Sequence, residues 1–190
     1  MQVEITGQTV VLDNIVTVDE LKAYMRVTHT AEDTLITALR LAAIAYVEEH
    51  CNIKLGTYNM RGYLPGFYNA YFPMGPVQAV TEVKYQTTED KTYSNLTTLA
   101  TTNWYTDLIS QPSRIAFRDS PNTYEYALTP VVITFSAGYT TVPTPVVHAI
   151  KLLVSTMYEN RQDEVTGTIT SRLKFGLDAL LNPFRIIYQP

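Results

Sequence analysis

The sequence has few of the groups on which most enzymes and nucleic-acid-binding proteins depend. It holds one cysteine, Cys51, so no disulfide can form within the chain and a reducing compartment is expected. Its 14 Lys and Arg residues form no cluster, and the net charge of -4 argues against a general nucleic-acid binder. No apolar run reaches the ~20 residues of a membrane span, and the start MQVEITGQTV lacks the order of a signal peptide. We expect a protein made in the cytoplasm that does not enter a membrane.

The residue patterns of common catalytic and metal sites are missing as well. The 3 histidines give no helical His-Glu-x-x-His pair, and His50 and Cys51 are helix neighbours that point in different directions. The 8 glycines form no phosphate-binding loop, dinucleotide fingerprint or nucleophile elbow. The adjacent carboxylates Glu48 and Glu49 are predicted to be solvent-exposed. We therefore predict no catalytic residue, no metal ligand and no cofactor.

What the sequence does contain is enough apolar residues for a packed domain. Hydrophobic residues make up 46% of its 190 residues and charged residues 17%, which predicts one globular domain rather than disorder. The 14 tyrosines are the unusual feature of the composition. Tyrosine is favoured at protein interfaces and also on half-buried faces of β-sheets, and the composition leaves both interpretations open.

The first part of the chain predicts two helices. Thr17 and Glu20 have the spacing of a capping box, so a short helix should run from about Val18 to Arg26. A longer helix should begin after Thr30, its expected N-cap, and end near Asn52. Apolar residues recur in it at helical spacing and should form a broad buried stripe: Leu35, Ile36, Leu39, Ala43, Tyr46, Val47 and His50.

The middle of the chain predicts β structure from about Ile53 to Gly138. Here β-branched and aromatic residues alternate with polar ones, and Pro or Gly interrupts every few positions. VQAVTEVKYQ and KTYSNL are predicted to form a hairpin turned at TTED, and PSRIAF and PVVITFSAGY are predicted to be further strands. The aromatic loop PGFYNAYFPMGP precedes them.

Helix returns after the β segment. Thr144 is the expected N-cap and Pro145 the first helical residue of a helix that should end near Asn160. A last short helix, FGLDALL, should be ended by Asn182 and Pro183. The predicted fold class is α+β: one domain over residues 1–190, with a helical core (15–52 and 144–182), a β subdomain (53–138) and a C-terminal arm (183–190).

Several segments together resemble a known protein family. VTVDELKAYMRV, EDTLITALRLAAIAYVEEH, PVQAVTEVKY, PSRIAF, VVITFSAGY, VPTPVVHAIKLLVSTMYENRQ and GLDALLNPFRI resemble, in this order, the head-to-tail connector adaptors of tailed bacteriophages and gene transfer agents. Each block alone is common, but the ordered set is specific, and it spans almost the whole chain. Two features depart from the family pattern. The loop PGFYNAYFPMGP contains more aromatic residues than is usual, and LKFG stands before the last helix where the family has a segment that contains proline.

The resemblance implies a structural protein of the virion without catalytic residues. Such proteins form a homo-oligomeric ring, by resemblance a dodecamer, in the neck at the portal vertex. The implied partners are the portal protein, a stopper or tail-completion protein, and genomic DNA that passes through the lumen without sequence-specific binding. A negative net charge, repeated around a ring, would repel phosphates and favour sliding of the DNA.

Two groups of residues are candidates for subunit contacts. One is the end of the helix that begins at Pro145, with Tyr158 on the core face and polar groups able to reach a neighbour: Tyr158, Glu159, Asn160 and Arg161. The alternative is an ordinary C-terminal cap, in which Asn160 adopts a left-handed turn and Arg161 neutralises exposed carbonyls. The other group is in the aromatic loop: Phe67, Tyr68 and Tyr71.

The C-terminal arm is predicted to dock on the portal or on a neighbouring subunit. It carries a β-prone apolar run where chain ends are usually polar: Phe184, Arg185, Ile186, Ile187 and Tyr188. Such a run needs a partner, and Arg185 could pair with an acidic group. The alternative is that the arm folds back over its own core.

Two other functions are compatible with parts of the sequence. One is a single-stranded nucleic-acid-binding module that uses tyrosines and Trp104 as stacking platforms, although the β segment has few Lys and Arg for a basic groove. The other is a hydrolase whose site has no recognisable pattern. A salt titration of DNA binding would test the first, and substrate turnover by a monomer would favour the second.

Overall fold

The computed structural model describes residues 1–9, 12–90, 92–160 and 176–187, and these form two compact units. The β unit contains residues 1–9, 57–139 and 186–190, and the helical unit contains residues 10–56 and 140–185. The predicted α+β class is confirmed. Besides the middle of the chain, the β unit takes in the first nine residues and the segment after residue 185.

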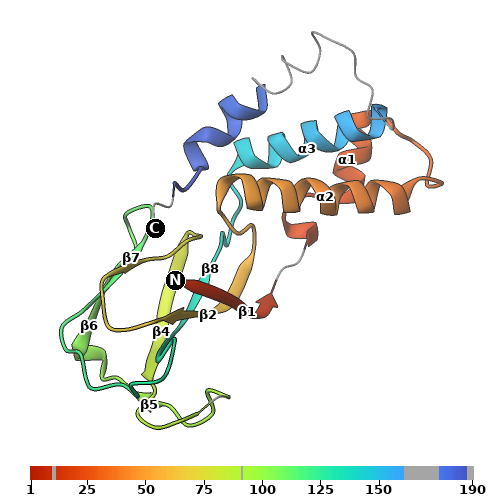
Figure 1. Cartoon of the computed structure of the whole chain (residues 1–190). Coiled ribbons are helices and arrows are strands. Elements are labelled where there is room, and N and C mark those ends of the chain that lie inside the picture. Colours follow the sequence, from red (N-terminus) through yellow and green to blue (C-terminus); the bar gives the residue numbers. More distant parts are fainter. Residues whose placement is uncertain (10–11, 91, 161–175, 188–190) are drawn as a thin grey trace. The chain divides into compact units, whose positions relative to one another are not determined.

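The helical unit is built from α1 (Val18–Met25), α2 (Asp33–Cys51), α3 (Thr144–Glu159) and a helical segment over residues 176–181 (Figure 1). Short 3-10 turns lie at Leu12–Asn14 and Asn182–Phe184. The predicted capping box of α1 is present: the Glu20 amide donates to Thr17 Oγ1 (3.1 Å), and the Thr17 amide donates to a Glu20 carboxylate oxygen (2.9 Å). Asn52 ends α2 in a left-handed conformation, as its predicted position at the helix end allows.

Two predicted N-caps are wrong by one or more residues. Thr30 does not cap α2, which begins at Asp33 after Glu32; the Thr30 carbonyl instead accepts from the Asp33 amide (3.2 Å) in a turn. Thr144 is the first residue of α3 rather than its cap, a position that Pro143 takes. In both places the chain enters the helix through a backbone turn, so no hydroxyl is needed to start it.

The core of the helical unit contains fully buried residues from α1, α2 and α3. Those with no exposed surface include Leu21, Ile36, Ala43, Val47, Val146, Ile150 and Val154. The predicted stripe of α2 is only partly right. Tyr46 is 50% exposed, and Leu35, Leu39 and His50 are half-buried, whereas Ile44 is buried.

Two charged residues explain the different orientation of α2. Arg40 is buried and donates to Asp13 (2.5 Å) and to the Val16 carbonyl (3.1 Å). Glu48, predicted to be exposed, is buried and accepts from the Leu55 amide (2.8 Å) and the Lys54 ammonium (2.8 Å). Because both charges have partners inside the unit, the helix turns them inward and part of its apolar surface outward.

The β unit contains two antiparallel sheets among its described residues. The larger has the order β1 (Gln2–Thr9), β2 (Thr57–Leu64), β8 (Val131–Ala137), β4 (Val77–Tyr85) and β5 (Thr97–Thr98). The smaller has the order β3 (Ala70–Tyr71), β7 (Arg114–Phe117) and β6 (Trp104–Asp107), with the 3-10 turn Thr101–Asn103 before β6 (Figure 1). The predicted strands PSRIAF and PVVITFSAGY correspond to β7 and β8.

Alternating side chains of the larger sheet form the core of the β unit. In β2, Met60 and Leu64 are buried while Asn59 and Arg61 are exposed, and the register pairs Met60 with Phe135 of β8. The ring centre of Phe72 lies 4.8 Å from that of Phe135, and Phe72 is fully buried. Strand β1 was not anticipated; it pairs with β2 along the sheet edge and is interrupted by a bulge between Ile5 and Gly7.

The predicted hairpin is partly wrong. The described residues of KTYSNL form no strand, and β4 pairs instead with the two-residue β5 that follows them. The Asp90 carboxylate explains the difference, because it accepts from the amides of Thr92 (2.9 Å) and Asn95 (2.6 Å). This local turn uses backbone donors that a strand would need.

Candidate assembly surfaces

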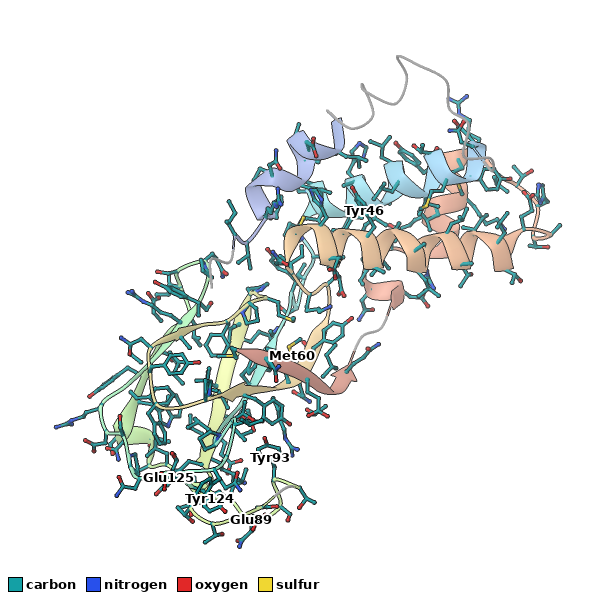
Figure 2. The ribbon with its side chains drawn as sticks, in the orientation of Figure 1. Tyr46, Met60, Glu89, Tyr93, Tyr124 and Glu125 are labelled. Carbon is teal, nitrogen blue, oxygen red and sulfur yellow. The ribbon has the colours of Figure 1, made fainter. Side chains whose placement is uncertain are left out.

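One side of α2 carries apolar side chains that no described part of the helical unit covers. Leu41 is 46% exposed and Tyr46 is 50% exposed, and Ala38, Ala42 and Ala45 are exposed on the same face. We call these five residues the α2 outer face; Figure 2 labels Tyr46. Alanines allow another helix to approach closely, and exposed apolar faces of this kind mark protein contacts.

Aromatic rings on the helical unit are held in place by histidines. The rings of Tyr46 and His50 are stacked, 5.6 Å apart and tilted by only 9°. On α1, Tyr24 is 40% exposed, and its ring centre lies 6.0 Å from that of His148 on α3, with the two rings nearly perpendicular. Two of the three histidines therefore support exposed tyrosines.

The aromatic loop contributes side chains both to the packed interior and to the surface of the β unit. The half-buried ring of Phe67 packs 5.5 Å from Tyr85 and 5.2 Å from Phe117, so this interface candidate contributes to the β unit's own packing. Tyr68 and Tyr71 are each 44% exposed. The loop can therefore present two tyrosines to a partner.

A hollow of about 310 Å³ lies on the smaller sheet, lined by Tyr71, Tyr105 and Ala116 among others. Arg114 lies in it, and its Nε is 3.3 Å from a carboxylate oxygen of Asp107. The Ser110 amide, with Arg114 contributing, holds the pKa of Asp107 below its ordinary value. The hollow thus has aromatic sides and a paired charge.

This hollow is the closest match to the stacking surface of the nucleic-acid alternative. Trp104 is half-buried, so its ring is not a freely exposed platform. The guanidinium of Arg114 is shared with Asp107, and the lining of the hollow contains no other Lys or Arg among the described residues. A stacking surface without a basic groove does not bind nucleic acid strongly.

At the end of α3, the predicted polar group is partly described. Tyr158 is half-buried and its hydroxyl donates to Glu32, joining α3 to the start of α2. Glu159 is exposed, and Asn160 is not left-handed but has φ −110°, with its side-chain amide donating to the Thr156 carbonyl (3.0 Å). Arg161 lies outside the described residues.

In the C-terminal arm, neighbouring residues have different surroundings. Phe184 is half-buried, Arg185 is exposed and Ile187 is 68% exposed. Ile186 is buried in the β unit at 5% exposure, so close to Gly75 that a Cβ there would lie 3.0 Å from its Cδ1. Tyr188 lies outside the described residues.

The groups most often used in catalysis have structural surroundings here. Cys51 is fully buried near the Leu181 carbonyl, and burial raises the pKa of its thiol, which lowers its reactivity. Within the described residues, no three His, Cys, Asp or Glu side chains are grouped to hold a metal ion. The described helices include none that is long and apolar enough to cross a membrane.

The exposure of the α2 outer face was not predicted from the sequence, nor were the loop tyrosines Tyr93, Tyr124 and Tyr126 of the β unit. The alanine-rich run ALRLAAIAY contains apolar residues on more than one side of a helix, which is the signal that could have revealed the outer face. For the loop tyrosines, only the high tyrosine content pointed to such surfaces.

Known structures share this fold from end to end. A chain from the neck of an empty gene transfer agent particle, computed with C6 symmetry, aligns with a TM-score of 0.75 at 22% identity, covering 100% of this chain and 98% of that one. A chain from the virion of the native gene transfer agent particle aligns with a TM-score of 0.76 at 22% identity. One from the neck of the native particle, computed with C12 symmetry, aligns with a TM-score of 0.69 at 20% identity, and both have the same coverage as the first. No curated protein sequence matches the chain.

The family assignment comes from the sequence itself. A family model described as phage gp6-like head-tail connector protein matches residues 15–111, just over half of the 190 residues. The matched region runs from before α1 through α2 and into the β unit, beyond β6. This chain belongs to the phage gp6-like head-tail connector family, whose members are structural proteins.

Proposed function

We propose that the protein is a head-to-tail adaptor that forms a ring in the virion neck, beneath the portal vertex. The ring extends the DNA channel from the portal and offers a docking surface to a stopper or tail-completion protein. Family membership is the observation that carries this proposal. The end-to-end fold similarity to chains from particle necks supports it, and the C12 symmetry of one of those necks supports a dodecamer.

A closed ring requires two different surfaces on each copy, because a head-to-tail interface joins unlike patches. The α2 outer face is our candidate for one patch, with Leu41 and Tyr46 as its large side chains. For the other we choose the surface around Tyr24 on α1. Among the described residues of the helical unit, these three are the large hydrophobic side chains that are exposed.

Mixing two ring-breaking variants tests this assignment. Leu41→Glu and Tyr24→Glu each damage one patch, and both positions are exposed enough to accept a charge without unfolding the unit. Each variant alone should stay monomeric by native mass spectrometry under conditions in which the unmodified protein, alone or with purified portal, forms rings. An equimolar mixture should form heterodimers, since one intact interface remains between unlike variants.

Thr98→Glu, an exposed change in the β unit, is the matched control and should leave rings intact. If either patch variant still forms rings, the contact is misassigned. If the unmodified protein forms no ring, either alone or on the portal, the adaptor function itself is wrong.

Passage of DNA through the ring requires a lumen that does not hold phosphates. The net charge of -4 per copy disfavours tight phosphate binding, and repetition around a ring increases the effect. We expect no sequence-specific contact with the genome. Binding of a duplex that persists at physiological salt would contradict the role of a conduit.

The C-terminal arm is proposed to reach the portal through its exposed side chains. Arg185 and Ile187 are exposed, and the buried Ile186 between them anchors the arm to the β unit. Truncation after Ile186 should therefore leave the subunit folded while it fails to join DNA-filled heads. Unfolding of this shorter chain, or normal joining, would show that the arm has no docking role.

A further inference from the structure

Three hollows adjoin one another around a single tyrosine of the β unit. Tyr93 lines a hollow of about 530 Å³ beside Gln2 and Val3 of β1, another of about 290 Å³ beside Tyr124, and a small one of about 80 Å³. Figure 2 shows Tyr93 near Glu89, Tyr124 and Glu125 at one end of this unit. We call this region the Tyr93 groove.

The position of Tyr93 is fixed from several sides. Its hydroxyl lies 2.6 Å from Thr129 Oγ1, and its ring centre is 5.3 Å from that of Tyr63. Its backbone adopts φ 53°, an uncommon conformation for tyrosine. The neighbouring Asp90 accepts backbone hydrogen bonds from Asn95 and Thr92, which lower the pKa of Asp90 to about 2. The groove is therefore built in advance rather than formed by loose side chains.

Aromatic faces and carboxylates make up much of the groove. Tyr63 donates to the Glu4 carboxylate (2.6 Å), and the rings of Tyr124 and Tyr126 are 5.7 Å apart. Tyr126 is 78% exposed and Leu128 is 88% exposed, so both can contact a ligand. Exposed apolar side chains held by such a frame indicate a contact surface.

The charge of the surrounding loops is mainly negative. Residues 86–95 and 119–130 contain four carboxylates, Glu89, Asp90, Asp119 and Glu125, against one basic residue, Lys91. The linings of the two larger hollows hold Glu4, Glu89 and Asp90 and contain no Lys or Arg among the described residues, whereas the small hollow holds Arg61 and Lys84 beside Glu82, so the negative charge lies in the two larger hollows. This charge repels nucleic acid and attracts lysine and arginine.

The shape of the region suits an extended ligand. The largest hollow runs beside residues 2–4 of β1, the edge strand of its sheet, and one side of that strand has no neighbour among the described strands. An extended segment could lie in the groove and pair with this edge before the bulge at Ile5 and Gly7. The tyrosine faces could then hold cationic side chains.

We propose that the Tyr93 groove binds an extended peptide segment of a partner protein that carries lysine or arginine side chains. Charge complementarity, ring faces exposed to solvent and an open strand edge all favour this ligand. The proposal does not depend on which partner in the particle supplies the segment, nor on the ring contacts at α2. Its test can therefore fail while the adaptor function stands.

Fluorescence anisotropy with a labelled peptide that alternates lysine and proline tests the proposal, with glutamate replacing lysine in the reference peptide. The lysine peptide should bind the full-length chain at low salt, and the reference peptide should not. Tyr126→Ala should weaken binding by about two- to fivefold, the size of an exposed cation–π contact. The double variant Glu89→Lys with Glu125→Lys should weaken it by about fivefold or more.

Glu49→Lys provides the matched control, because it reverses an exposed charge on α2, in the other unit. It should change binding by less than about twofold if the groove is the site. An equal loss with this variant would mean that overall charge alone attracts the peptide, and the proposal would fail. It would also fail if the lysine peptide does not bind, if oligothymidine binds better, or if the groove variants instead break contacts between copies of the chain.

Discussion

Replacement of Ile36 by alanine should destabilise the helical unit strongly, whereas the same truncation at Leu41 should not. Both residues lie on α2, but Ile36 has no exposed surface and Leu41 is 46% exposed. Ile36→Ala removes three buried carbons, worth about 2.4 kcal/mol at about 0.8 kcal/mol each, and leaves a cavity. We expect a loss of about 2–5 kcal/mol in the free energy of unfolding. Leu41→Ala should cost less than about 1 kcal/mol.

The two units allow this prediction to be measured separately from the rest of the chain. The one tryptophan, Trp104, is in the β unit, so its fluorescence reports that unit, while helical circular dichroism reports mainly the helical unit. In a urea titration, Ile36→Ala should shift the dichroism transition to lower urea, and Leu41→Ala should leave it nearly unchanged. Similar shifts for both variants would refute the assigned orientation of α2.

Three further predictions concern single groups. Thr17→Ala removes the hydroxyl that caps α1 and should cost about 1 kcal/mol by the same dichroism assay; no change would mean that the capping box adds nothing. The buried thiol of Cys51, with its raised pKa, should react with a thiol reagent much more slowly in the native protein than in urea, and equal rates would contradict its burial. Because folding lowers the pKa of Asp90 from 3.8 to about 2, its stabilisation is complete above pH ~4 and lost as the pH falls through ~2. The difference in unfolding free energy between the unmodified protein and Asp90→Asn should therefore shrink over that interval, and a constant difference would contradict the carboxylate's role.

Much of the fold could be predicted because local sequence signals agreed with the tertiary structure. The capping box at Thr17 and Glu20, the helix end at Asn52 and the strand patterns of β7 and β8 all depend on residues close in sequence. Local geometry of this kind is available to a reader of the sequence. It was enough to predict an α+β fold with a β segment between helices.

The missed features depend on contacts between α2 and residues outside it. From the sequence, Glu48 and Arg40 both look like solvated charges. In the fold, the Leu55 amide and Lys54 contact Glu48, and Asp13 and the Val16 carbonyl contact Arg40. Periodicity places apolar residues on a face but cannot show that such charges are satisfied inside. The orientation of α2 was therefore beyond the sequence alone.

The predicted interface residues were chosen by chemical type, and the structure separates them by exposure. Phe67 and Tyr68 are neighbours in one loop, yet the first packs among other rings and the second faces outward. Likewise Ile186 is buried while Ile187 is exposed. Which member of such a pair reaches the surface depends on the backbone path, and composition does not determine that path.

The partners of Arg40 and Glu48 set the orientation of α2, but that orientation leaves apolar surface exposed that does not stabilise an isolated copy. Turning Arg40 and Glu48 inward requires buried hydrogen-bond partners for both, and Arg40 Nε is left without one, while Leu41 and Tyr46 face water, where their apolar surface adds little to folding. An assembled ring would supply the missing burial, because a second copy can cover that face. Different substitutions on this one helix should then affect either the stability of a copy or its assembly. Changes at Ile36 should lower the unfolding free energy of single copies, whereas changes at Leu41 should leave folded copies that no longer join one another.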